Sequence, residues 1–210
     1  MTDKNVSIMN IGSMGYLPQV FKKIENEKKL NIVYLGGSIT MGCNATKTEL
    51  RYVDRSAKWW QTNFPDAEIS YFNAGIGATT SQFGVARVQE HVLDKQPDLV
   101  FVEFSVNDSS SLLFMETYES LVRRLLKAES VKAVVLINNL FYDTGTNAQG
   151  IHNAIGLHYD LPIVSVRNYI FPEIQLGNVC LADYTADMLH PTDLGHKMIA
   201  DLICNLLDTC

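Results

Sequence analysis

Two short segments, about 150 residues apart, contain the residue types needed for nucleophilic catalysis. The first places Ser38 directly after Gly36-Gly37, at the end of an apolar stretch. The second places Asp187 three residues before His190. A serine becomes a nucleophile at neutral pH when a histidine takes its proton and a carboxylate orients that histidine. Because i and i+3 side chains meet within a helical turn, Asp187 and His190 are the candidate acid and base for Ser38.

Ser38 and its neighbour Cys43 also have simpler interpretations. A lone serine after two glycines is most often a helix N-cap or a turn residue. The alternative of a phosphate-binding loop is excluded, because the pattern G-x-x-x-x-G-K-[ST] is absent. Cys43 has no histidine near it in sequence, so we expect it to be a small packing residue and not the nucleophile.

The segment around His190 equally fits a surface turn before the last helix. In that interpretation Thr192 or Asp193 caps the helix. It explains the residues after position 192 well, so we expect His196 to be structural.

Groups able to stabilise an oxyanion follow two further apolar stretches. The loop 73–81 is rich in small residues, which expose backbone N–H groups. Asn107 ends another stretch, and its side-chain amide is a second kind of donor, while Asp108 can brace the loop. Taken alone, each segment is also typical of an ordinary turn.

The elements that must position these residues follow from the alternation of apolar stretches with helical patterns. Strands are predicted at 32–35, 69–72, 99–104, 131–137 and 163–166. Helices are predicted at 18–29, 49–64, 81–95, 118–130, 147–158 and 193–207. Continuous apolar strands separated by helices indicate a doubly wound α/β domain whose parallel sheet is covered on both faces. Ligands bind beyond the carboxyl ends of such strands, where the polar segments fall.

Length and composition narrow the remaining options. The 210 residues fit one domain over 1–210, with a leading helical segment at about 1–30. The net charge of −6 and the lack of basic runs make nucleic acid an unexpected partner. No apolar stretch approaches the ~20 residues that span a bilayer, so no membrane partner is expected. The N-terminus lacks a signal-peptide pattern and the four cysteines lack metal spacing, so we expect free thiols in the cytoplasm.

Together these segments resemble the SGNH hydrolases, also called the GDSL esterase and lipase superfamily. Four blocks carry the resemblance in order, at 36–40, 73–80, 105–108 and 187–190. It implies a single-domain three-layer α/β sandwich with a five-stranded parallel sheet, flavodoxin-like in arrangement. No metal or organic cofactor is implied.

The resemblance also assigns roles to residues. It implies a catalytic triad of Ser38, Asp187 and His190. It implies an oxyanion hole made by the backbone N–H groups of Ser38 and Ala78 and the side chain of Asn107.

The sequence departs from the usual pattern of the family at three positions. Gly37 replaces an aspartate and Ser105 replaces a glycine, and we expect both changes to be tolerated. Ala78 stands where the second block usually has its oxyanion glycine. It keeps the N–H group, so we expect this donor to function if the local dihedral angles suit an L-residue. A positive φ would argue against it.

The Gly-Gly-Ser-Ile-Thr form of the first block is also similar to a subset of bacterial carbohydrate esterases that remove acetyl groups from plant polysaccharides. This similarity implies a serine esterase that removes short acyl groups, foremost acetyl, from the hydroxyls of a small-molecule or oligosaccharide ester. Two alternatives stay open: a thioesterase or lysophospholipase, which needs an apolar acyl channel, and a non-catalytic carbohydrate-binding protein on the same fold. The sequence also leaves open whether the protein is a monomer or a homodimer.

Overall fold

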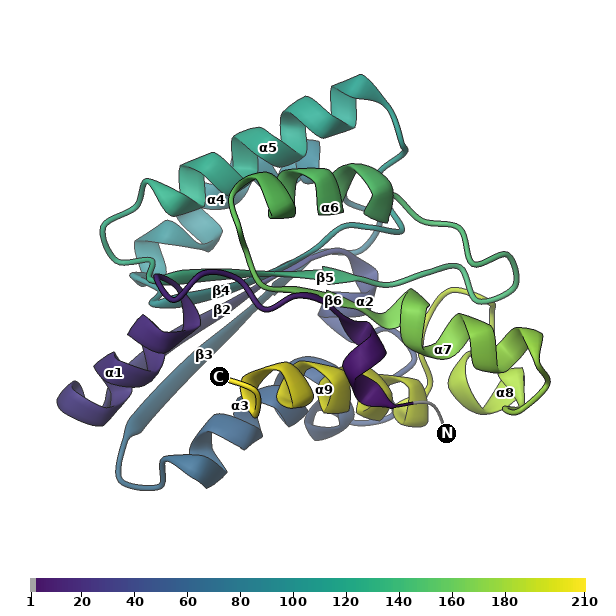
Figure 1. The fold of residues 1–210 in the computed structure, drawn as a ribbon, viewed down its shortest axis with the longest axis horizontal. Coiled ribbons are helices and arrows are strands. Elements are labelled where there is room, and N and C mark those ends of the chain that lie inside the picture. Colours follow the sequence, from purple (N-terminus) through teal and green to yellow (C-terminus); the bar gives the residue numbers. More distant parts are fainter. Residues whose placement is uncertain (1–2) are drawn as a thin grey trace.

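The computed structural model describes residues 3–210, which form a mixed six-stranded sheet between two layers of helices (Figure 1). The strand order across the sheet is β1-β6-β5-β4-β2-β3. The strands are β1 (Ile8–Asn10), β2 (Lys29–Gly36), β3 (Glu68–Gly75), β4 (Leu99–Glu103), β5 (Ala133–Asn138) and β6 (Ile163–Ser165).

The sheet has one strand more than expected. Strands β2 to β6 pair in parallel, and they are the five strands that the apolar stretches predict. The expectation of an entirely parallel, five-stranded sheet is wrong, because β1 adds antiparallel to the edge of β6, with Ile8 opposite Val164. β1 has only three residues and no periodic pattern, so it forms because β6 offers a free edge. The parallel strands alone have the flavodoxin order 2-1-3-4-5.

Within residues 3–210, six α-helices lie at the predicted positions, most with different bounds, whereas the helices at 38–41, 166–175 and 181–184 were not predicted. The α-helices are α1 (Leu17–Glu27), α2 (Ser38–Met41), α3 (Tyr52–Asn63), α4 (Ser81–His91), α5 (Leu112–Leu126), α6 (Gln149–His158), α7 (Val166–Gln175), α8 (Leu181–Tyr184) and α9 (Asp193–Leu207). The short 3₁₀ helices are η1 (Lys4–Ser7), η2 (Thr48–Leu50) and η3 (Leu93–Lys95). The leading segment expected at 1–30 therefore contains a strand as well as helices, and its residues 1 and 2 lie outside the described part.

Alternate residues of each central strand face different helix layers. Along β4, Leu99 and Phe101 pack in a core with α1, α3, α7 and α9, whereas Val100 and Val102 pack in a core with α4, α5 and α6. Figure 1 shows these two groups of helices on opposite faces of the sheet. Burial on both faces explains why β4 reads as a continuous apolar run.

The loops that follow β2, β3 and β4 leave the same edge of the sheet, as the parallel pairing requires. Across residues 3–210, no helix combines the length and the apolar character needed to cross a bilayer. The four cysteines are free thiols.

Candidate active site

Ser38 is the first residue of α2, a single helical turn that begins directly after β2. The chain is very crowded here, since a Cβ on Gly36 would lie 2.1 Å from Oγ1 of Thr40. Glycine at position 36 therefore lets the strand turn sharply into the helix. The turn leaves Ser38 only 7% exposed.

The structure brings Ser38, His190 and Asp187 together. The Oγ atom of Ser38 lies 2.9 Å from Nε2 of His190, and Nδ1 of His190 lies 2.6 Å from Oδ2 of Asp187. The other carboxylate oxygen accepts the backbone N–H groups of Leu189 and His190, at 3.1 and 2.7 Å. These bonds orient the carboxylate toward the imidazole ring.

The ionisation of Asp187 suits this geometry. Burial raises the pKa of the Asp187 carboxyl, but hydrogen bonds from the His190 ring and from the backbone of His190 and Leu189 outweigh it and lower the pKa to about 2. An ionised Asp187 favours the tautomer of His190 that carries its proton on Nδ1. The lone pair on Nε2 then faces the Ser38 hydroxyl, as a general base requires.

Thr185 closes the loop that carries Asp187 and His190. Its hydroxyl donates to the backbone oxygen of His190 at 2.9 Å. Thr185 also forms an isolated β-bridge with Pro191. The two ends of the loop are therefore fixed to each other, which limits the positions that the His190 ring can take.

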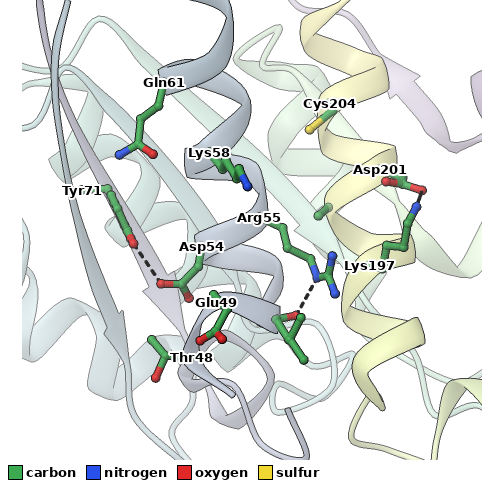
Figure 2. A pocket seen from close by; sticks show the side chains of 12 residues that line it. Thr48, Glu49, Asp54, Arg55, Lys58, Gln61, Tyr71, Lys197, Asp201 and Cys204 are labelled. Atoms are coloured by element: carbon green, nitrogen blue, oxygen red, sulfur yellow. Dashed lines mark hydrogen bonds and ion pairs between the residues drawn. The ribbon is translucent and has the colours of Figure 1, made fainter. Parts of the chain in front are cut away.

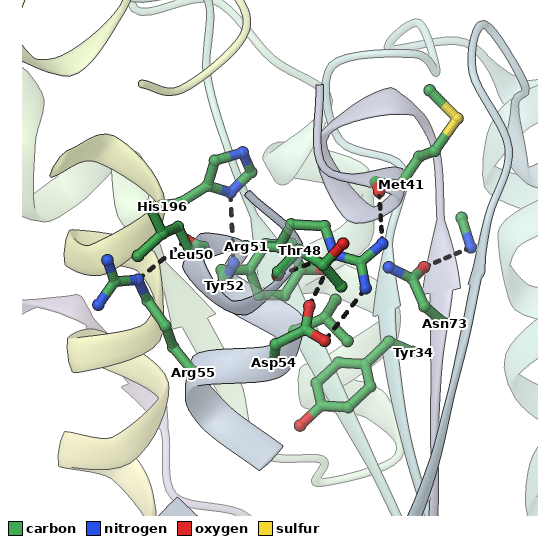
Figure 3. Close-up of polar contacts among 12 residues, drawn as sticks. Tyr34, Met41, Thr48, Leu50, Arg51, Tyr52, Asp54, Arg55, Asn73 and His196 are labelled. Carbon is green, nitrogen blue, oxygen red and sulfur yellow. Dashed lines mark hydrogen bonds and ion pairs between the residues drawn. The ribbon is translucent and has the colours of Figure 1, made fainter. Parts of the chain in front are cut away.

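Two side chains hold the carbonyl end of α2, and Figure 3 shows both side chains and the contact of Arg51 with Met41. Asn73 donates to the oxygen of Thr40 at 2.8 Å, and Arg51 donates to the oxygen of Met41 at 3.4 Å. Arg51 is itself held by both oxygens of Asp54, at 2.6 and 3.1 Å. Sequence reasoning missed Arg51, because an arginine at the start of a helix gives no signal for this contact.

His196 lies in a different place from His190. Its Nε2 is 3.0 Å from the backbone oxygen of Cys43, and its Nδ1 accepts the N–H group of Tyr52 at 3.4 Å (Figure 3). Burial lowers the pKa of His196. The carboxylate of Asp193 accepts the backbone N–H and the hydroxyl of Thr46, at 2.8 and 2.7 Å. These contacts fix the segment after α2 to the start of α9.

The candidate oxyanion donors lie beside Ser38. A Cβ on Gly77 would be 4.0 Å from Cβ of Ser38, so the loop before Ala78 passes close to the hydroxyl. Among residues 3–210, no acceptor pairs with the backbone N–H of Ala78 or with Nδ2 of Asn107. The N–H of Ser38, as the first residue of α2, has no partner within the helix. The φ angle of Ala78 is +57°, the left-handed conformation that favours glycine. This positive φ argues against Ala78 as a donor, whereas the N–H group that it keeps argues for it, so its place in the oxyanion hole stays a proposal.

Arg87 joins the strands that lead to Ser38 and to Ala78. Its guanidinium donates to the oxygens of Ala74 and Gly36, at 2.6 and 3.0 Å. The N–H group of Ile76 donates to the same Gly36 oxygen at 3.1 Å. Burial lowers the pKa of Arg87 to about 10, so the side chain is still a cation at neutral pH. Sequence reasoning missed this role, because an arginine within a predicted helix carries no signal for it.

Ser105, the second departure from the family pattern, is buried below the site. Its hydroxyl donates to the oxygen of Asn139 at 3.1 Å and lies 3.4 Å from Oε1 of Glu103. The other oxygen of Glu103 lies 3.5 Å from Oγ1 of Thr40. Burial raises the pKa of Glu103 to about 7.

A separate cavity of about 590 Å³ lies between α3 and α9 (Figure 2). Its walls include Arg55, Lys58, Tyr71 and Lys197, and none of the triad candidates lines it. Within the described part of the chain, no group of three or more His, Cys, Asp or Glu side chains is placed to hold a metal ion.

Several known proteins with a similar sequence or structure are named as esterases. A curated acetylxylan esterase from Geobacillus stearothermophilus is 25% identical over 207 residues, which cover 85% of this chain and 93% of that protein. The structure of a two-domain esterase active on acetylated mannans, co-crystallized with mannopentaose, matches with 45% identity and a TM-score of 0.97. This match covers the whole chain but only 57% of the two-domain esterase, so the chain spans little more than half of that protein.

A catalytic mutant of an acetylxylan esterase from Geobacillus stearothermophilus shares the fold, with 21% identity and a TM-score of 0.70. That match covers 85% of this chain and 94% of the other. Residues 34–198 also match the family described as GDSL-like Lipase/Acylhydrolase. Because this match takes in most of the sequence and the strand ends that carry Ser38 and Asn107, the chain belongs to the GDSL-like lipase/acylhydrolase family.

Proposed function

We propose that the protein is a serine esterase that removes short acyl groups, foremost acetyl, from carbohydrate hydroxyls. The observation that carries the proposal is the continuous hydrogen-bonded chain from Ser38 through His190 to Asp187, with distances of 2.9 and 2.6 Å. The acetylated carbohydrates in the names of the similar esterases support the substrate class.

In the first half of the reaction, Oγ of Ser38 forms a bond to the ester carbonyl carbon while Nε2 of His190 takes the hydroxyl proton. Asp187 stabilises the resulting imidazolium. The tetrahedral intermediate then breaks its bond to the sugar oxygen, and His190 gives its proton to that oxygen. The sugar leaves and the acyl group stays on Ser38.

In the second half, water attacks the acyl carbon and His190 takes one of its protons. The bond to Oγ of Ser38 breaks, and His190 returns a proton to the serine. A carboxylic acid is released and the free enzyme is restored, so the cycle consumes one water.

The negative charge of both tetrahedral intermediates is proposed to lie against the N–H groups of Ser38 and Ala78 and the amide of Asn107. A donor that is already in position when the charge develops lowers the barrier, and removing one costs on the order of 3 kcal/mol. Within the described residues these donors have no acceptor of their own, which supports this role.

The nucleophile is tested by covalent labelling and by substitution. A fluorophosphonate probe is expected to add one label, on the peptide that contains Ser38, and Ser38→Ala is expected to lose hydrolysis of an acetyl ester dye by several orders of magnitude. The substituted protein is expected to stay folded. Labelling at Cys43, with activity retained in Ser38→Ala, would reassign the nucleophile.

The substrate class is tested by incubating the enzyme with acetylated manno-oligosaccharides and xylo-oligosaccharides and recording the mass of the products. Each acetyl group lost is replaced by a hydrogen, so the mass is expected to fall by the difference between the two. A protein that binds these sugars without changing their mass would be a carbohydrate-binding protein on this fold.

Two expectations about the whole protein remain proposals. The first is that residues 1–210 act as one domain, which the single continuous sheet supports. The second is a cytoplasmic location, which the four free thiols support. Limited proteolysis tests the first, and fractionation of the source cells tests the second.

A further inference from the structure

Asp108 and His152 form a buried pair that the mechanism above does not use. Oδ2 of Asp108 lies 3.1 Å from Nε2 of His152, and both side chains are fully buried. His152 belongs to α6, and its ring stacks on Tyr118 of α5 with 3.6 Å between ring centroids and 8° between planes. The stacking fixes the plane of the imidazole, so its Nε2 is held toward the carboxylate.

The other oxygen of Asp108 reaches a different loop. Oδ1 accepts the backbone N–H of Ser81 at 2.9 Å, and Ser81 begins α4 three residues after Ala78. Asp108 also directly follows Asn107, and the N–H groups of both residues donate to the oxygen of Phe104, at 2.9 and 3.0 Å. One carboxylate therefore connects the two loops that carry the proposed oxyanion donors Ala78 and Asn107.

Stacking alone does not account for a histidine at position 152. Burial lowers the pKa of His152, against the opposing effect of Asp108, and a neutral ring donates from Nε2 to the carboxylate. Nδ1 of His152 is buried with no hydrogen-bond partner in residues 3–210. An unpaired buried nitrogen is unfavourable, and a phenylalanine would stack on Tyr118 without that penalty. What a histidine offers here, and a phenylalanine does not, is the N–H group directed at Asp108.

We propose that His152 is a positioning residue of the esterase site, which acts by holding Asp108 and through it the loops of Ala78 and Asn107. This role rests on the proposed function, because it is defined by the oxyanion hole. His152 touches neither the substrate nor the reacting atoms. Its effect is expected on the transition state, where the oxyanion exists, and not on the binding of the ground state.

The test compares two substitutions in the full chain. His152→Phe keeps the stacking but removes the donor, and His152→Gln keeps an N–H group that can reach Asp108. With an acetyl ester dye, His152→Phe is expected to lower kcat by at least roughly tenfold and to leave KM within about twofold. The loss of kcat is expected to be smaller than the loss caused by removing an oxyanion donor itself. His152→Gln is expected to recover most of kcat. Equal losses in both variants would overturn the proposal.

A double-mutant cycle with Asn107→Ala separates positioning from general destabilisation. If His152 acts through the oxyanion hole, His152→Phe is expected to cost much less kcat in the Asn107→Ala background than in the wild type. The same fold-loss in both backgrounds would overturn the proposal.

Folding and catalysis are followed separately in the same proteins. If His152→Phe does not fold, Asp108→Asn replaces it in the cycle, with the same requirement that its kcat loss shrink beside Asn107→Ala. Full activity in Ser38→Ala would refute the proposed function itself. Full activity in a folded His152→Phe protein would refute only the positioning role.

Discussion

Gly37 and Asn107 touch each other at the centre of the candidate site. A Cβ on residue 37 would lie 2.4 Å from Oδ1 and 3.2 Å from Cγ of Asn107. The amide therefore occupies the space that any larger residue at position 37 would need. Gly37, which replaces the usual aspartate of the family, leaves room for the Asn107 side chain to lie beside the serine.

Gly37→Ala is expected to reduce turnover while leaving stability nearly unchanged. The added methyl collides with the end of a side chain, which can move, and the movement displaces Asn107 from its proposed position at the oxyanion. We expect kcat to fall by roughly 10- to 100-fold, approaching the loss of a whole donor, with a small change in KM. Steady-state kinetics and thermal denaturation measure both effects. Gly150→Ala is the matched control, because a Cβ there meets no atom within 4 Å. A kcat within twofold of the wild type in Gly37→Ala would contradict the expected displacement.

Ala78 offers a second test of the oxyanion hole, since its φ of +57° is strained for an L-residue. Ala78→Gly relieves that strain but makes the unfolded chain more flexible. We therefore expect the free energy of unfolding to rise by between zero and about 1 kcal/mol. Because the N–H group keeps its direction, kcat is expected to stay within about threefold. Ala78→Val is expected to be destabilised and slower, because a β-branched residue fits this conformation badly. Steady-state kinetics measure kcat, and denaturant unfolding measures stability. A large loss of kcat in Ala78→Gly would mean that the methyl group itself contributes.

Asp187→Asn is expected to keep the fold and to lower kcat by roughly 10²- to 10⁴-fold, because an amide does not favour the productive tautomer of His190. Asp193→Asn and Asp183→Asn are the matched controls. Asp193 accepts hydrogen bonds from Thr46, whereas the ring of His190 is bonded to Asp187, so the loss in Asp193→Asn is expected to be far smaller. Comparable kcat losses in Asp183→Asn and Asp187→Asn would move the acid role to another carboxylate.

The same residue predicts a feature of acid stability. The pKa of Asp187 falls from its ordinary 3.8 to about 2 on folding. A depressed carboxyl pKa stabilises the fold at pH values above about 4, and this contribution is lost as the pH falls toward 2. Unfolding measured between pH 5 and pH 2 is therefore expected to show a weaker acid sensitivity in Asp187→Asn than in the wild type. Parallel curves for the two proteins would contradict the shift.

The raised pKa of Glu103 leads to the opposite dependence of stability on pH, at higher pH. Burial, together with the charge of Asp108, raises the pKa of the Glu103 carboxyl from 4.5 to about 7, against hydrogen bonds from Ser105 and Thr40. Between these two values the unfolded chain releases a proton that the folded protein retains, so stability decreases as the pH rises. The slope is at most about 1.4 kcal/mol per pH unit and ends above the folded pKa. Glu103→Gln is expected to lack this slope in denaturant unfolding from pH 5 to pH 8. An unchanged slope in the variant would assign the effect to another group.

The sequence predicts those parts of the molecule whose signal is local. The central parallel strands were predictable because burial on both faces produces continuous apolar runs such as Leu99 to Phe104. The contact between Asp187 and His190 was predicted from their i, i+3 spacing, and it is confirmed. The expected helical turn is wrong, because the two residues meet in a bent loop in which Met188 has a φ of +66°. The strand β1 was missed, since its three residues pair only because β6 presents a free edge.

Contacts between distant segments were beyond sequence reasoning. Arg87 reaches the oxygens of Gly36 and Ala74, and His152 reaches Asp108, across 51, 13 and 44 residues respectively. Nothing in the type or spacing of these residues indicates the pairing, which depends on how the helices pack on the sheet. The strained φ of Ala78 could be named as a condition from the family pattern, but only the backbone geometry decides it.

Acyl length is expected to separate a carbohydrate acetylesterase from a lipid or thioester hydrolase. The loops that carry the site are short, and Ile76 and Leu189, both partly buried, lie next to the candidate donors and to His190. A methylene that fits such a wall gains only ~0.8 kcal/mol, whereas one that displaces packed atoms costs ~1–3 kcal/mol. We therefore expect kcat/KM to fall from acetyl to butyryl to octanoyl esters of one chromogenic alcohol. Acetylated oligosaccharides are expected to be better substrates than lysophospholipids or acyl-coenzyme A. A rate that rises through octanoyl would favour the lipid or thioester alternative and would leave the proposed roles of Ser38 and His190 intact.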